Sequence, residues 1–209
     1  MEEKEIHDEL TAIRGLMERS SKFISLSGLS GILAGVYSLV AAIIAYLIIK
    51  DNPLDIKQVS FFEALGNASH ILIGFALIAV IVLILSITTA VILSKNKATR
   101  KGQSIWGKTS QELLFHMTVP LLTGGIVIAL FLYYGNIAFI VPTMLVFYGL
   151  ALVSASNFTF NVVKYLGLLE IALGLIAACL PGYGLLFWAL GFGVLHIIYG
   201  GMMYLKYDR

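Results

Sequence analysis

The sequence predicts an all-α membrane protein, a bundle of six transmembrane helices preceded by an amphipathic N-terminal helix. Composition, the length of the apolar segments and the placement of lysine and arginine support this fold class. Of the 209 residues, 59% are hydrophobic and 12% are charged, and the mean hydropathy is +0.92. A soluble domain carries roughly 25% charged residues, and a fold of this size cannot bury so much apolar surface in water. Lipid is therefore the expected solvent for most of the chain.

Six segments are long and apolar enough to cross a bilayer, which takes about 20 residues of helix. None has the alternating pattern that a transmembrane β-barrel requires. Short connections at Gly135-Asn136 and at Pro181-Gly182-Tyr183 predict antiparallel hairpins of spans three and four and of spans five and six. The predicted organisation is an N-terminal amphipathic helix over 1–25, a transmembrane domain over 26–205 with spans at about 26–49, 70–93, 113–134, 137–156, 162–180 and 184–205, and a tail over 206–209.

Basic residues predict the orientation, because lysine and arginine are concentrated on the cytoplasmic side of membrane proteins. With the N-terminus inside, the outer segments hold only Lys50 and Lys57. The inner segments hold Lys4, Arg14, Arg19, Lys22, Lys95, Lys97, Arg100, Lys101, Lys108, Lys164, Lys206 and Arg209. Both termini are therefore expected in the cytoplasm and the chain in the inner (plasma) membrane. The basic loop between spans two and three is expected to anchor at the lipid headgroups, and no nucleic-acid partner is predicted.

The N-terminal segment carries apolar residues spaced alternately by four and three, a pattern typical of a coiled-coil seam. The seam consists of Ile6, Leu10, Ile13 and Met17. The rest of the segment mixes acidic and basic residues, whereas a helix that lies on an anionic membrane is usually basic. We therefore expect this seam to pack against protein: the same helix of a second copy, another protein partner, or the chain's own basic inner loop.

One acidic residue, Glu170, lies deep in a span, and ionisable groups there are costly enough to suggest a function. In an antiparallel hairpin, residues at one depth have numbers that add to a constant total, which places Glu170 within one residue of level with His196. Each lies three and four residues from flanking glycines, on one helix face. The register is set by two glycine pairs whose numbers share one total, Gly167 with Gly200 and Gly174 with Gly193. The sequence therefore predicts that Glu170 and His196 form a hydrogen-bonded intramembrane pair across a glycine seam.

Other polar residues cluster near the expected cytoplasmic boundary. Glu112 and His116 are four apart and share a helix face, and Asn157 and Asn161 follow span four, so these four are candidate accessory groups. The sequence lacks a phosphate-binding glycine loop, cysteine metal spacing and a nucleophile elbow. We therefore expect no catalytic residues, no cofactor and no metal. A haem would need two histidines at one depth, and His116 is closer to the boundary than His196.

The segment Leu168–Leu175, with the sequence LLEIALGL, is followed by Pro181-Gly182. This stretch resembles helical hairpins of small six-span bacterial inner-membrane proteins of unassigned function. The resemblance implies a bacterial inner membrane and carries over no functional residue.

Three function classes remain open from the sequence. The leading expectation is a non-enzymatic regulatory or assembly partner that acts through its cytoplasmic N-terminal helix. The first alternative is a small transporter or channel with a proton- or cation-linked site at Glu170 and His196. The second alternative is a membrane redox or lipid-modifying enzyme. An aqueous path that reaches Glu170 from both sides of the membrane favours the first alternative, and a bound cofactor favours the second. A sealed core around Glu170 favours the regulatory or assembly partner.

Overall fold

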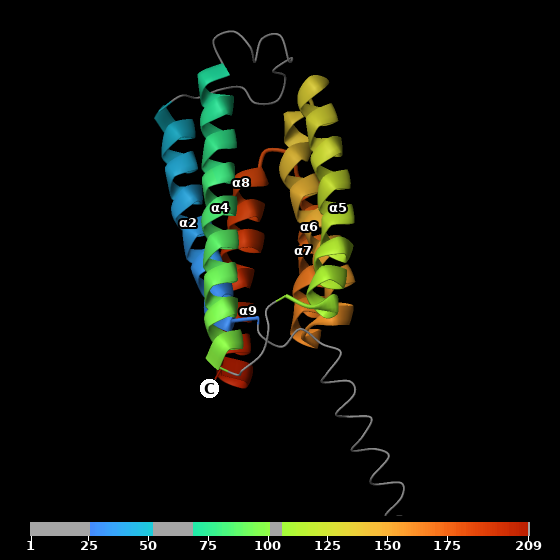
Figure 1. The fold of residues 1–209 in the computed structure, drawn as a ribbon. Helices are drawn as coiled ribbons and strands as arrows, with labels where there is room; N and C mark the ends of the chain where they lie inside the picture. Colours follow the sequence, from blue (N-terminus) through green and yellow to red (C-terminus); the bar gives the residue numbers. More distant parts are fainter. Residues whose placement is uncertain (1–25, 52–68, 101–105, 209) are drawn as a thin grey trace, which may run out of the picture.

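The computed structural model describes residues 26–51, 69–100 and 106–208, and these ranges are almost entirely helical (Figure 1). The helices are α2 (Gly28–Asp51), α4 (Ser69–Arg100), α5 (Lys108–Tyr133), α6 (Ile140–Ala155), α7 (Asn161–Cys179), α8 (Gly184–Trp188) and α9 (His196–Met203). Short 3₁₀ turns, η2 (Ile137–Phe139) and η3 (Ser156–Phe158), flank α6. Six helical segments are long and apolar enough to span a membrane, so the predicted fold class is confirmed. The seam of Ile6, Leu10, Ile13 and Met17 lies outside the described residues.

The last span is a single helical rod with two π-helical stretches. It runs from Gly184 to Asp208, and we call it span six. Within it, η4 (Ala189–Leu195) and η5 (Tyr204–Asp208) are π-helical, with α8 and α9 as the α-helical parts. The π-helix is rare, and a single π-helical turn within an α-helix often marks a functional site.

The six spans are arranged as two units of three helices (Figure 1). Unit one consists of α2, α4 and span six, and α2 contacts both of the others. Unit two consists of α5, α6 and α7, and α6 contacts both of the others. Unit one thus combines the first two spans with the last. We call the end of the bundle where α2 begins and span six ends the basic end, because it carries Lys95, Lys97, Arg100, Lys108, Lys164 and Lys206.

Glycines hold the helices within each unit at close range. A Cβ added at Gly200 of span six would lie 2.5 Å from the backbone nitrogen of Ile32 in α2. In unit two, a Cβ at Gly149 of α6 would lie 2.5 Å from the carbonyl oxygen of Gly167 in α7. Small residues are what allow helix backbones to approach this closely in lipid.

The predicted glycine seam between spans five and six is wrong. Gly167 and Gly174 of α7 face α6, and Gly193 and Gly200 of span six face α2. A spacing of three and four residues places the glycines on one face of a helix. It does not identify which neighbouring helix that face meets.

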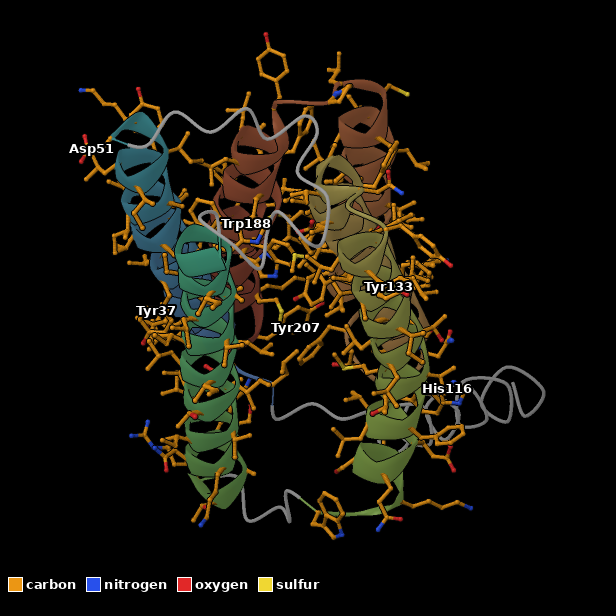
Figure 2. All side chains as sticks on the ribbon, turned by 90° about the horizontal axis from the view of Figure 1, so that it is seen from above. Tyr37, Asp51, His116, Tyr133, Trp188 and Tyr207 are labelled. Carbon is orange, nitrogen blue, oxygen red and sulfur yellow. The ribbon has the colours of Figure 1, made fainter. Side chains whose placement is uncertain are left out.

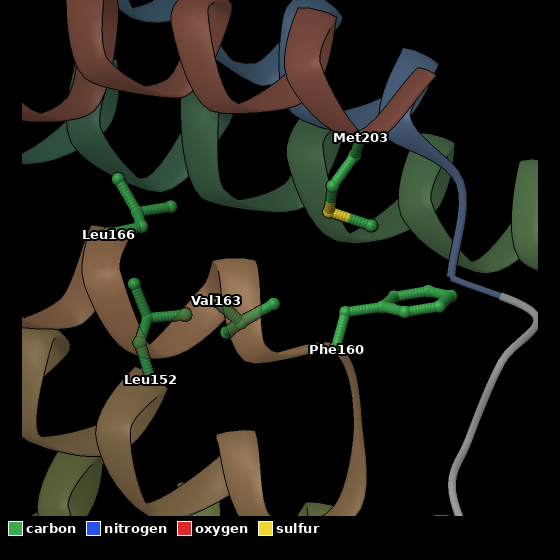
Figure 3. Close-up of a cluster of buried hydrophobic side chains, with 5 residues drawn as sticks. All are labelled: Leu152, Phe160, Val163, Leu166 and Met203. Carbon is green, nitrogen blue, oxygen red and sulfur yellow. The ribbon is translucent and has the colours of Figure 1, made fainter. Parts of the chain in front are cut away.

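Side chains fill the space between the two units in two apolar clusters. The first, which we call the basic-end cluster, consists of Leu152, Phe160, Val163, Leu166 and Met203, with Met203 from span six and the others from unit two (Figure 3). The second, the far cluster, has Leu145, Ala177 and Phe187 at its centre. The interface between units is therefore built from side chains, whereas two helix pairs within the units have backbone-close glycine contacts.

Asp208 closes unit one at the basic end. Its Oδ2 accepts hydrogen bonds from the backbone N–H of Gly28 at 2.8 Å and from the hydroxyl of Ser27 at 3.1 Å. Its Oδ1 lies 2.5 Å from Nζ of Lys97 in α4, which also donates to the carbonyl of Leu26. A carboxylate at a helix N-terminus satisfies free N–H groups and interacts favourably with the helix dipole. We call this arrangement the Asp208 clasp; the 206–209 segment, expected as a tail, is helical as far as Asp208.

Candidate functional site: a buried carboxyl between the two units

Glu170 lies near the middle of α7 and is completely buried, with 0% of its surface exposed. Neither carboxyl oxygen has a hydrogen-bond partner among the described residues. Buried polar atoms almost always have partners, so an exception calls for an explanation. A carboxylate in such a place is far more costly than a neutral carboxyl group.

His196 faces Glu170 from span six, directly after the π-helical stretch η4. Its Nδ1 lies 3.4 Å from Oε1 of Glu170 and 3.0 Å from the carbonyl oxygen of Gly191. The ring is also buried, with 7% of the residue exposed. The structure thus brings together the two residues that the hairpin register places at one depth. The predicted hydrogen bond between them is wrong, because Nδ1 donates to the Gly191 carbonyl instead.

Tyr148 of α6 is a third member of the cluster, and the sequence analysis missed it. Its hydroxyl lies 2.7 Å from Nε2 of His196, and the two rings stack with centroids 5.4 Å apart. The ring of Phe192 packs beside both. The rule that residues at one depth have numbers with a constant total also holds for the antiparallel spans four and five. Applied to them, it places Tyr148 level with Glu170. The signal was therefore present in the sequence.

The three polar residues, which we call the Tyr148–Glu170–His196 cluster, form a layer between the two apolar clusters. In each of the three helices the polar residue lies, along the helix, between a residue of the far cluster and a residue of the basic-end cluster. Along the chain these series are Leu145, Tyr148 and Leu152 in α6, then Leu166, Glu170 and Ala177 in α7, then Phe187, His196 and Met203 in span six. Apolar side chains of the described residues therefore lie between the cluster and each end of the bundle.

The other candidate residues do not join this cluster. Glu112 and His116 pair with each other at 3.9 Å on α5, and about half of each side chain is exposed. Figure 2 shows His116 on the outer side of the bundle, where its ring stacks on Phe158. Asn157 is exposed and donates to the carbonyl of Ser154, and Asn161 is exposed at the start of α7.

Metal chemistry gains no support from the described part of the chain, where no three His, Cys, Asp or Glu side chains converge. Comparison with known proteins adds nothing to this geometry. No family model matches the chain, and no match to it was found among the curated proteins or the solved structures.

Proposed function

We propose that this chain is a small proton-linked channel or transporter in which Glu170 is the proton-carrying carboxyl. The observation that supports this proposal most directly is the complete burial of a carboxyl group with neither oxygen hydrogen-bonded to any residue that the structure describes. A residue that only fastened two helices would be expected to use those oxygens. Hydrogen bonds between membrane helices contribute about 0.6 kcal/mol on average, and the cost of burying an unpaired polar group exceeds this.

A proton fits the surroundings of Glu170 better than a metal cation does. Hard cations such as Ca²⁺ take about six to eight oxygen ligands, whereas a proton neutralises a carboxylate without further ligands. Among the described residues, neither carboxyl oxygen of Glu170 has a hydrogen-bond partner, and the Tyr148 hydroxyl and the Gly191 carbonyl are both engaged with His196. Glu170 is therefore proposed to bind and release a proton and not a metal cation.

The division into two units supports a way for protons to reach the site. Side chains at the interface between units can rearrange without disturbing the glycine contacts inside each unit. We propose that relative movement of the units opens the basic-end cluster and the far cluster in turn, which connects Glu170 to one side of the membrane at a time.

Proton flux into vesicles tests this function. Purified protein is reconstituted into vesicles that contain a pH-sensitive dye, and a potassium diffusion potential draws protons inward. The wild-type protein is expected to acidify the vesicles much faster than empty vesicles acidify. Glu170→Gln, which cannot release a proton, should reduce this rate by about 10²-fold, the lower range for a positioned proton-transfer group.

Glu112→Gln is the matched control, because Glu112 is a half-exposed glutamate outside the cluster. It should retain the wild-type rate. The proposed function is wrong if wild-type vesicles acidify no faster than empty ones, or if Glu170→Gln is as active as Glu112→Gln.

We further propose that the basic end faces the cytoplasm of a bacterial inner membrane. Support comes from the basic residues gathered at that end, with Lys50 at the other. Single cysteines at Lys57, Lys101 or Lys164, in a Cys179→Ser background, test this with a membrane-impermeant maleimide on whole cells. Lys57→Cys should react in intact cells, and the other two only after lysis. Labelling of Lys101→Cys but not Lys57→Cys in intact cells would reverse the orientation.

A further inference from the structure

The hydrogen bonds of His196 determine which of its ring nitrogens carries the hydrogen. A backbone carbonyl can only accept, so the 3.0 Å contact with Gly191 requires a hydrogen on Nδ1. In the neutral ring Nε2 is then an acceptor, and the Tyr148 hydroxyl at 2.7 Å is its donor. The hydrogen-bond network thus assigns the tautomer and the roles of both nitrogens.

The N–H of His196 has two acceptors within reach. Nδ1 is 3.0 Å from the Gly191 oxygen and 3.4 Å from Oε1 of Glu170. Gly191 lies in the π-helical stretch, and its lack of a side chain is what admits the carboxyl, since a Cβ there would be 2.5 Å from Oε2 of Glu170. The hydrogen on Nδ1 therefore has two acceptors whose distances from the nitrogen differ by little.

We propose that Tyr148 is a positioning residue of the proton site. It holds His196 in place while the Nδ1–H changes its hydrogen-bond acceptor. When Glu170 loses its proton, the Nδ1–H stops donating to the Gly191 carbonyl and donates to the Glu170 carboxylate instead. A hydrogen bond to an ionised acceptor is roughly twice as strong as one to a neutral acceptor, so the loss of the proton favours the exchange. This inference rests on the proposed role of Glu170 as a group that releases a proton.

The described residues place few other titratable groups near this exchange. Tyr148 faces Glu170 from α6 and His196 faces it from span six, while Lys164 and Tyr165 of α7 are exposed toward the basic end. No nearby charge in this part of the chain competes for the Nδ1–H. When Glu170 takes the bond, the Gly191 carbonyl is released, which couples the charge of Glu170 to the π-helical stretch of span six.

Nitrogen NMR of His196 in lipid nanodiscs tests this proposal without requiring transport. In a background with His7, His70 and His116 replaced by glutamine, ¹⁵N-histidine labels His196 alone. The expected spectrum shows hydrogen on Nδ1 and a hydrogen-bonded Nε2. Raising the pH until Glu170 ionises should shift the Nδ1–H signal toward that of a stronger hydrogen bond, and Glu170→Gln should abolish the shift.

Tyr148→Phe should move the Nε2 signal to that of a free nitrogen and remove the pH-dependent shift at Nδ1. It should also slow proton uptake by about tenfold, the effect of one well-placed hydrogen bond. Tyr199→Phe is the control, because it removes a tyrosine hydroxyl three residues from His196 in span six. It should leave both signals unchanged. Hydrogen on Nε2 in the neutral ring, or a full pH-dependent shift in Tyr148→Phe, would overturn the proposal.

The two proposals fail in distinguishable ways. Proton flux that depends on Glu170, together with unchanged Nδ1 signals across the pH range, leaves the function in place and excludes the role of Tyr148. The Tyr148-dependent shift without proton flux in vesicles establishes the hydrogen-bond exchange and excludes transport.

Discussion

Gly200→Ala is expected to destabilise the protein by about 3 kcal/mol, the upper range for inserting an extra methyl into a packed site. The new Cβ would lie 2.5 Å from the backbone nitrogen of Ile32 and 2.8 Å from the carbonyl oxygen of Gly28. Backbone atoms cannot rotate away as a flexible side chain can, so α2 and span six must separate. The midpoint of thermal unfolding in detergent should fall by roughly 6–12 °C.

The neighbouring glycine provides a matched control. A Cβ added at Gly201 has nothing within 4 Å. Gly201→Ala therefore adds the same methyl group to span six as Gly200→Ala does, but without a collision. Its midpoint should equal or slightly exceed that of the wild type, because alanine has the higher helix propensity. Equal losses for the two variants would show that the contact between α2 and span six is not as close as the structure places it.

Asp208→Ala is expected to cost about 3–5 kcal/mol, the range for removing one partner of a buried ion pair. The side chains of Lys97 and Asp208 are only 13% and 8% exposed, so Lys97 would be left with an uncompensated charge. The same substitution removes the acceptor for the N–H of Gly28 at the start of α2. The measurement is again the thermal midpoint, compared with Lys206→Ala, which removes an exposed side chain nearby.

Two further variants separate the parts of this effect. Asp208→Asn keeps an oxygen for Gly28 and should recover part of the loss. Lys97→Met combined with Asp208→Asn removes both charges and should be more stable than Asp208→Ala. If Asp208→Ala unfolds at the wild-type midpoint, the Asp208 clasp contributes nothing to the stability of unit one.

The depth of Glu170 and His196 was predictable from the sequence, because two glycine pairs set the register and the short connection between spans five and six leaves that register little freedom. That argument placed Glu170 and His196 level, and their side chains are 3.4 Å apart in the structure. Tyr148 lies in span four, and the count for spans five and six does not include that helix. Applying the same count to the connection between spans four and five would have found it.

The pairing of the helices was not predictable in the same way. Glycine spacing identifies a close-packing face, but a helix in a six-helix bundle has several neighbours, and Gly167 and Gly200 turned out to meet different ones. The Asp208 clasp joins residues from 26 to 208, and nothing local in the sequence pairs Lys97 with Asp208. The π-helical stretch next to His196 also has no sequence signal that we identified.

The composition of unit one affects the order in which the protein can assemble during synthesis. Spans three, four and five are consecutive, so unit two can form while the ribosome is still translating. The glycine face of α2 must wait for span six, and at about 5–20 residues per second the stretch from Asp51 to Gly184 takes on the order of ten seconds to make. During that interval the glycine face of the first span faces lipid or an insertion factor, which makes this the step most exposed to mispairing with other nascent membrane helices.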